Sequence, residues 1–138
     1  MNMYLSAFGN YNPNELKEEL NWDFLSSNPN LSIEDIRANS SKLNWEILSQ
    51  NQVLTEECIE EFQDRLNWDY ISSFQKLSED FIIKFENKIN WELISEYQHL
   101  SKPFIRKYIH KLNCEIILLN YDFTRDDLIY QYCKLKMV

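Results

Sequence analysis

Apolar residues along the chain recur at helical spacing and are interrupted at short intervals by polar residues. Near the middle, the apolar positions Ile59, Phe62 and Leu66 follow steps of three and four. Side chains at such steps share one face of an α-helix. The pattern predicts a short helix over residues 68–74 and a longer one over residues 79–88.

A side chain able to cap a helix precedes each predicted helix. Asn67 stands before the first, and Ser78 stands before the second, where Glu79 and Asp80 follow it. Asn, Ser and Thr accept hydrogen bonds from the unpaired N–H groups of a first helical turn. Acidic side chains are favourable there because of the helix dipole.

This pair of helices recurs every 23 residues. The first position of the first helix is Trp22, Trp45, Trp68, Trp91 and Cys114. Two aliphatic columns keep the same spacing: Leu25, Leu48, Ile71, Ile94 and Ile117, and Ile36, Ile59, Ile82, Ile105 and Leu128. The spacing predicts a leader, residues 1–19, and five repeats: 20–42, 43–65, 66–88, 89–111 and a degenerate 112–138.

Helix pairs of this length cannot bury their apolar faces alone, so each repeat must pack on its neighbours. The predicted fold is all-α: a small α-solenoid of stacked two-helix repeats that forms a single domain over residues 20–138. A β-solenoid is the alternative for a 23-residue period. It is disfavoured because the chain has one Gly and three Pro for the turns that each coil needs.

The repeats carry an L-N-W-[DE]-x-[IL]-S motif followed by L-[ST]-E-x-x-I-x-x-F, most closely in residues 43–111. This motif resembles the short tandem helical repeats of largely uncharacterised proteins from large DNA viruses, bacteriophages and some bacteria. The resemblance implies a helical interaction scaffold encoded by a virus or mobile element. It implies no catalytic residues and names no partner.

The Trp and Asn columns have structural interpretations. One large ring per repeat, beside apolar neighbours, predicts a stacking core rather than a binding stripe. The Asn residues are expected to cap helices.

Charge narrows the expected partners. The formal net charge is −8, so direct binding of nucleic acid is not expected, because a phosphate-binding surface needs a basic stripe. No apolar run approaches the length of a membrane span, and residues 1–10 do not resemble a signal peptide. With three cysteines in no paired spacing, the protein is expected in the cytoplasm, that of the host cell if it is viral.

No enzyme, metal site or cofactor is predicted. His99 and His110 do not recur beside a nucleophile or carboxylate. His110 and Cys114 alone fall short of the three or four ligands of a zinc site. Cys58 shares a column with Phe81, so it is expected to be a buried small apolar residue.

Candidate binding residues lie where the repeat leaves positions variable. One predicted acidic face lies on the second helix of residues 43–65: Glu56, Glu57, Glu60, Glu61 and Asp64. The equivalent positions of residues 89–111 carry a basic patch: Lys102, Arg106, Lys107 and His110. These two repeats have net charges of −5 and +2.

A second candidate set is aromatic and consists of Tyr70, Phe74 and Tyr97 in first-helix columns. Phe74 and Tyr97 lie one period apart and are expected to be neighbours. They would anchor a partner or complete a core, and the sequence leaves both open.

The leading functional hypothesis is a non-catalytic protein-binding repeat module. Its acidic face would dock on the basic, nucleic-acid-binding surface of a host or defence protein, such as a CRISPR nuclease, and inhibit it. The alternative is a structural, self-assembling scaffold component of a virus or phage.

Overall fold

The computed structural model describes residues 21–51 and 53–138, so the predicted leader, residues 1–19, lies outside the described residues. Within these ranges the chain forms α-helices and no β-strand, which confirms the predicted all-α class. The chain divides into two compact units, Met1–Asn67 and Trp68–Val138, named here the N-terminal and the C-terminal unit. The stacking of all repeats into one solenoid domain stays a prediction.

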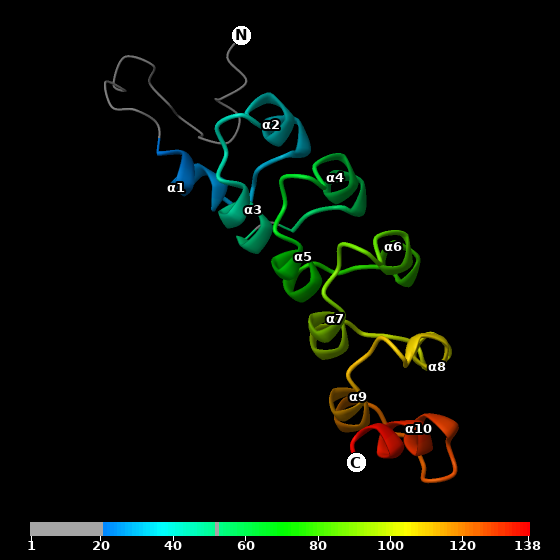
Figure 1. The fold of residues 1–138 in the computed structure, drawn as a ribbon. Coiled ribbons are helices and arrows are strands. Elements are labelled where there is room, and N and C mark those ends of the chain that lie inside the picture. Colours follow the sequence, from blue (N-terminus) through cyan, green and yellow to red (C-terminus); the bar gives the residue numbers. More distant parts are fainter. Residues whose placement is uncertain (1–20, 52) are drawn as a thin grey trace, which may run out of the picture. The chain divides into compact units, whose positions relative to one another are not determined.

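Each repeat contributes two short helices. The described part of the N-terminal unit holds α1 Trp22–Ser26, α2 Ile33–Ala38, α3 Trp45–Asn51 and α4 Glu56–Glu61. The C-terminal unit holds α5 Trp68–Phe74, α6 Glu79–Lys84, α7 Trp91–Tyr97, α8 Lys102–Tyr108, α9 Cys114–Asn120 and α10 Leu128–Lys136. First helices pack on first helices: α1 on α3 in one unit, and α5 on α7 and α7 on α9 in the other, where α10 covers α9 (Figure 1).

Most predicted helix starts are confirmed. The Asn90 side chain accepts hydrogen bonds from Glu92 and Leu93 at the start of α7. Ser78 accepts from the Phe81 N–H at the start of α6. The same role is filled by Asn21, Ser32, Thr55, Ser101 and Asn113. These caps satisfy N–H groups that a short helix leaves unpaired.

The second helices are shorter than predicted, so the expected helix over residues 79–88 is wrong in length. α6 ends at Lys84, where Phe85 leaves helical geometry with φ −110° and ψ 27°. The Phe85 carbonyl then accepts the N–H groups of Lys88 and Ile89 at 2.8 and 3.1 Å. This turn buries both Phe85 and Ile89, so apolar burial is gained by a turn instead of further helix.

The aliphatic columns form the core. First-helix residues Leu48, Ile71, Ile94 and Ile117 and second-helix residues Ile59, Ile82 and Ile105 have no exposed surface. The Trp column is only half-buried, so its assignment to the core holds in part. A cation from the end of the same repeat lies 5.1–5.8 Å from each ring centroid: Lys42, Arg65, Lys88 and Lys111 over Trp22, Trp45, Trp68 and Trp91.

A buried serine joins successive first helices. The Ser72 hydroxyl donates to the Trp68 carbonyl at 2.6 Å and accepts the Asn90 N–H at 3.0 Å. Ser26, Ser49 and Ser95 make the equivalent pair of bonds. Asn side chains add a second link, as Asn90 Nδ2 donates to Asp69 at 2.8 Å. The starts of α3, α7 and α9 are thereby tied to the first helix before them, and within the N-terminal unit Ser49 holds the Asn67 N–H in the same way.

The last repeat departs from the predicted register. Thr124, at the column of the helix-capping residues, precedes a turn in which its carbonyl accepts the Asp127 N–H. The helix α10 begins only after Asp127, whose carboxylate caps it at the Ile129 N–H and also pairs with Arg106. A carboxylate cap held by a cation is stronger than a hydroxyl cap. In consequence Leu128, expected in the core column, is exposed, and Ile129 is buried instead.

Replacing Ser72 by Ala should lower the free energy of unfolding by about 1–3 kcal/mol, because the Asn90 N–H loses its acceptor in a buried place. The matched control is Ser73→Ala on the same helix, since Ser73 bonds only within α5, to the Asp69 carbonyl. That change should cost less than about 0.5 kcal/mol. Urea unfolding followed by circular dichroism measures both, and equal losses would contradict the role given to Ser72.

Candidate functional site

The predicted acidic face lies mainly on α4. Thr55 caps this helix, and Cys58 and Ile59 are buried on its inner side. Glu57, Glu60 and Glu61 are exposed on the outer side, and Glu56 is half-buried. The burial of Cys58 confirms its expected apolar role. Asp64 was expected on the same helix, which is wrong: α4 ends at Glu61, and Asp64 lies in the turn that follows.

A basic residue from the preceding repeat partly neutralises this acidic face. Arg37 at the end of α2 holds Glu61 through both carboxylate oxygens, at 2.7–3.0 Å, and its NH2 lies 3.8 Å from Glu57. The hydrogen bond from Arg37 lowers the pKa of Glu61. Glu61 therefore has an internal partner, whereas the Glu57 side chain keeps 83% of its surface exposed.

The aromatic candidates lie on α5 and α7 in the C-terminal unit. Phe74 and Tyr97 are 58% and 54% exposed, and Tyr70 is half-buried. The rings of Tyr70 and Phe74 have centroids 6.0 Å apart. A hydrogen bond with Glu96 raises the pKa of Tyr97. Of the two interpretations left open by the sequence, the exposure of Phe74 and Tyr97 favours a surface pair over a core.

The acidic and aromatic candidates belong to different units. Glu56, Glu57, Glu60, Glu61 and Asp64 all lie in the N-terminal unit; Tyr70, Phe74 and Tyr97 all lie in the C-terminal unit. Each set is a local surface by itself. Their use as one binding surface stays a prediction.

The basic patch makes contacts within the chain. Lys102 donates to the Asp122 carbonyl at 2.8 Å, and Arg106 pairs with Asp127 at 3.0 Å. Lys107 lies 5.2 Å from the Tyr108 ring centroid. The contacts of Lys102 and Arg106 join α8 to the last repeat, so part of the positive charge in this patch has a structural role.

Two columns that position backbone groups were missed by sequence reasoning. The serine column belongs to the L-N-W-[DE]-x-[IL]-S motif and recurs every 23 residues, but its bond to the next repeat was not expected. Gln98 donates to the carbonyls of Ser72 and Gln75 and accepts the Leu77 N–H. Tyr121, one period later, accepts the Leu100 N–H at 2.7 Å. The recurrence of Gln at positions 52, 75 and 98 was the available signal.

Residues 21–51 and 53–138 contain no group of three or more His, Cys, Asp or Glu side chains arranged to hold a metal ion. Within the same ranges, none of the helices has the length and apolar character to cross a membrane. Comparison with family models, curated proteins and solved structures finds no match to this chain.

Glu61 should titrate below the ordinary range of a glutamate. Because its pKa is lowered in the folded state, the pairing contributes stability above the ordinary glutamate pKa and is lost as the pH falls through the folded-state value. Carbon-detected NMR titration of the Glu61 carboxyl group measures this. Arg37→Gln should return the pKa to its ordinary range, and Arg65→Gln, which removes a nearby cation over Trp45 instead, should leave it unchanged.

The cysteines should differ in reactivity. Burial, together with a hydrogen bond from the Cys133 thiol to Cys114, raises the pKa of Cys133 to about 12, and Cys58 is also buried with a raised pKa. Because the thiolate is the reactive form, iodoacetamide at pH 8 should modify half-buried Cys114 first. Peptide mapping by mass spectrometry checks the order. All three should react at similar rates in urea, and fast labelling of Cys133 in the folded protein would contradict its burial.

Proposed function

We propose that this protein is a non-catalytic protein-binding repeat module. The observation that carries the proposal is that repeated positions are buried and variable positions are exposed. Repeated residues such as Ser72 and Ile71 face inward and make contacts within the fold. Variable positions face outward and carry glutamates on α4 and aromatic rings on α5 and α7. Repeat scaffolds commonly bind through such variable surfaces.

We infer that the five repeats stack into one α-solenoid. Its support is that the serine bond joins successive first helices in the same way in both units, as Ser49 does to Asn67 and Ser72 to Asn90. First helices also pack on first helices within each unit. In a solenoid the outward positions would form long continuous surfaces.

The proposed partner is another protein with a basic surface. Residues 43–65 hold six acidic residues and one basic residue, and Glu57 and Glu60 point away from the core of their unit. Such a face attracts Lys and Arg on a partner and speeds association. Together with the resemblance to viral repeats, this supports a virus- or mobile-element-encoded inhibitor that covers the nucleic-acid-binding surface of a host or defence protein, a CRISPR nuclease for example.

The second candidate function is a structural, self-assembling component. It is favoured by one specific observation, the exposure of Leu128 and Leu135 on the last helix, α10. Exposed leucines on one helix face are typical of a surface that packs against another chain.

Removing the outward charges of α4 should weaken partner binding. The test variant carries Glu56→Gln, Glu57→Gln and Glu60→Gln and keeps Glu61, because Glu61 anchors Arg37. Proteins crosslinked to the wild-type chain in the cells that produce it are identified by mass spectrometry, and the captured partner is purified. Its affinity for the variant, by biolayer interferometry, should fall on the order of tenfold or more, mainly through the association rate, and added salt should have the same effect.

The matched control removes the same number of charges elsewhere, by Asp80→Asn, Glu115→Gln and Asp122→Asn, all at exposed positions of the C-terminal unit. It should bind as the wild type does, with helix content unchanged in both variants. An equal loss in both would mean that net charge, not the α4 face, governs binding. An unchanged affinity of the α4 variant, with loss on replacing Lys102, Arg106 and Lys107, would reverse the polarity of the proposal and favour an anionic partner.

A further inference from the structure

An apolar stripe runs along the outer side of α10. Leu128, Tyr132 and Leu135 lie at steps of four and three, which place them on one helical face. Leu128 and Leu135 are 78% and 80% exposed. The buried residues of this helix, Ile129 and Cys133, lie on another side. Tyr132, between the two leucines, is half-buried.

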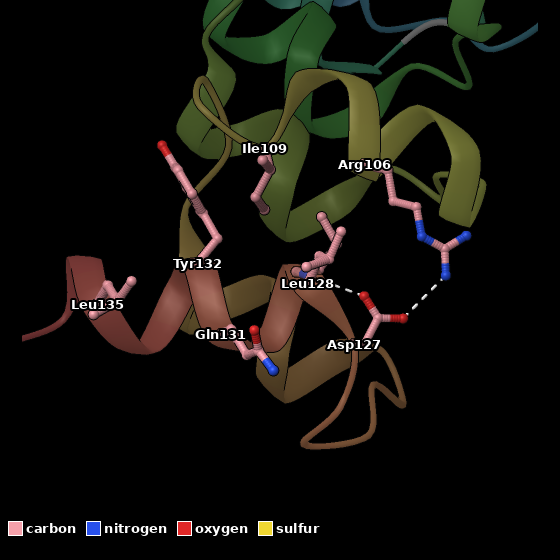
Figure 2. A pocket seen from close by; sticks show the side chains of 8 residues that line it. Arg106, Ile109, Asp127, Leu128, Gln131, Tyr132 and Leu135 are labelled. Carbon is pink, nitrogen blue, oxygen red and sulfur yellow. Dashed lines mark hydrogen bonds and ion pairs between the residues drawn. The ribbon is translucent and has the colours of Figure 1, made fainter.

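The stripe borders an open groove of about 670 Å³ between α8 and α10. Figure 2 shows Leu128 and Tyr132 projecting from α10 toward Ile109, the residue directly after α8, with the Arg106–Asp127 ion pair near one end and Leu135 at the other. The groove wall is largely aliphatic and aromatic. It is suited to an apolar helix face rather than to an extended polar segment.

We propose that this stripe is a self-association surface, on which the α10 helix of a second copy of the chain packs antiparallel about a two-fold axis. The steps of four and three are those of a coiled-coil seam. In the antiparallel arrangement Leu128 of one chain faces Leu135 of the other, and the two Tyr132 rings lie near the axis. A two-fold contact of this kind is self-complementary, as most homodimer interfaces are.

Charge selects a second copy over another kind of partner. Residues 122–138 hold three acidic and three basic side chains, a net charge of zero in a chain of −8. Before the helix stand Asp122, Arg125 and Asp126, with Asp127 already paired with Arg106, and Lys134 and Lys136 occupy its last turn. Antiparallel pairing sets the lysines of one chain beside the acids of the other and aligns the helix dipoles favourably. Parallel pairing would bring like charges together.

The register shift of the last repeat creates the stripe. Leu128 occupies the column that is buried in the four earlier repeats, and the late start of α10 after Asp127 turns it outward. Positions where a local rule is broken are frequently functional. This inference does not depend on the proposed acidic binding face, which lies in the N-terminal unit.

Analytical ultracentrifugation of the whole chain tests the pairing. With rising concentration the wild type should shift from one chain of 16.8 kDa to twice that mass. Leu128→Ser with Leu135→Ser should keep one chain at every concentration. The matched control is Leu119→Ser, because Leu119 is an equally exposed leucine (83%) outside the stripe, on α9; it should dimerise as the wild type does.

A charge exchange tests the antiparallel geometry. Lys134→Glu with Lys136→Glu, and separately Asp126→Lys, should each weaken the dimer on the order of tenfold at low salt. Mixed together, the two variants should form a heterodimer of wild-type strength, because opposite charges meet again at both ends. Far-UV circular dichroism checks that each variant keeps its helices.

Several results would overturn the proposal. A wild type that stays a single chain up to millimolar concentration would do so, as would a dimer that survives the double leucine change. Failure of the mixed charge variants to pair would refute the antiparallel arrangement. If the wild type is monomeric and the leucine change instead abolishes capture of another protein, the groove belongs to that protein. The α4 glutamine variant should still dimerise, so loss of partner binding and loss of dimerisation are separable.

Discussion

The buried serine hydroxyl on the first helix of each of the first four repeats is the constraint on which the other repeat contacts depend. In Ser72 it donates to the carbonyl four residues earlier and accepts the Asn90 N–H eighteen residues later. Because one oxygen serves both, the end of one first helix and the start of the next are fixed within hydrogen-bond distance. An insertion of even one residue between Ser72 and Asn90 would have to bulge outward to keep this bond. The constant period of 23 residues follows from that geometry.

Helix starts and core columns could be predicted from the sequence because their causes are local or periodic. Ser78 caps α6 through an N–H three residues away, and Ile71 and Ile94 differ by one period and are both buried. Most helix ends could not be predicted, since apart from Pro29, three residues after α1, no Gly or Pro follows closely on a helix in the described residues. α6 ends at Lys84 because Phe85 and Ile89 both reach the core through a turn, and that depends on packing. The half-burial of Trp68, with Lys88 5.8 Å from its ring centroid, likewise depends on packing.

The residues of the candidate site could be predicted from the sequence, but their ion pairs and the exposure of the aromatic rings could not. The glutamates of α4 and their outward direction follow from the spacing of Cys58 and Ile59 on the buried side. The pairing of Glu61 with Arg37 joins residues 24 apart, and it required the three-dimensional arrangement of α2 and α4. The exposure of Phe74 and Tyr97 also required it, because an aromatic residue at a helix end suits a core or a surface equally well.

The fifth repeat changes three repeated features at once, and these changes are physically linked. Cys114 replaces the tryptophan, Leu118 replaces the serine, and the second helix begins at Leu128 rather than after Thr124. Without a hydroxyl at position 118, a further first helix would find no acceptor for its opening N–H. Position 114 also lacks the ring that, in two earlier repeats, contacts the aromatic residue directly after the second helix: Trp45 with Phe62 and Trp68 with Phe85. The second helix of this repeat starts later than in the other repeats, after the Asp127 cap that Arg106 holds. Leu128, which stands in the buried aliphatic column, is therefore exposed instead of completing the core.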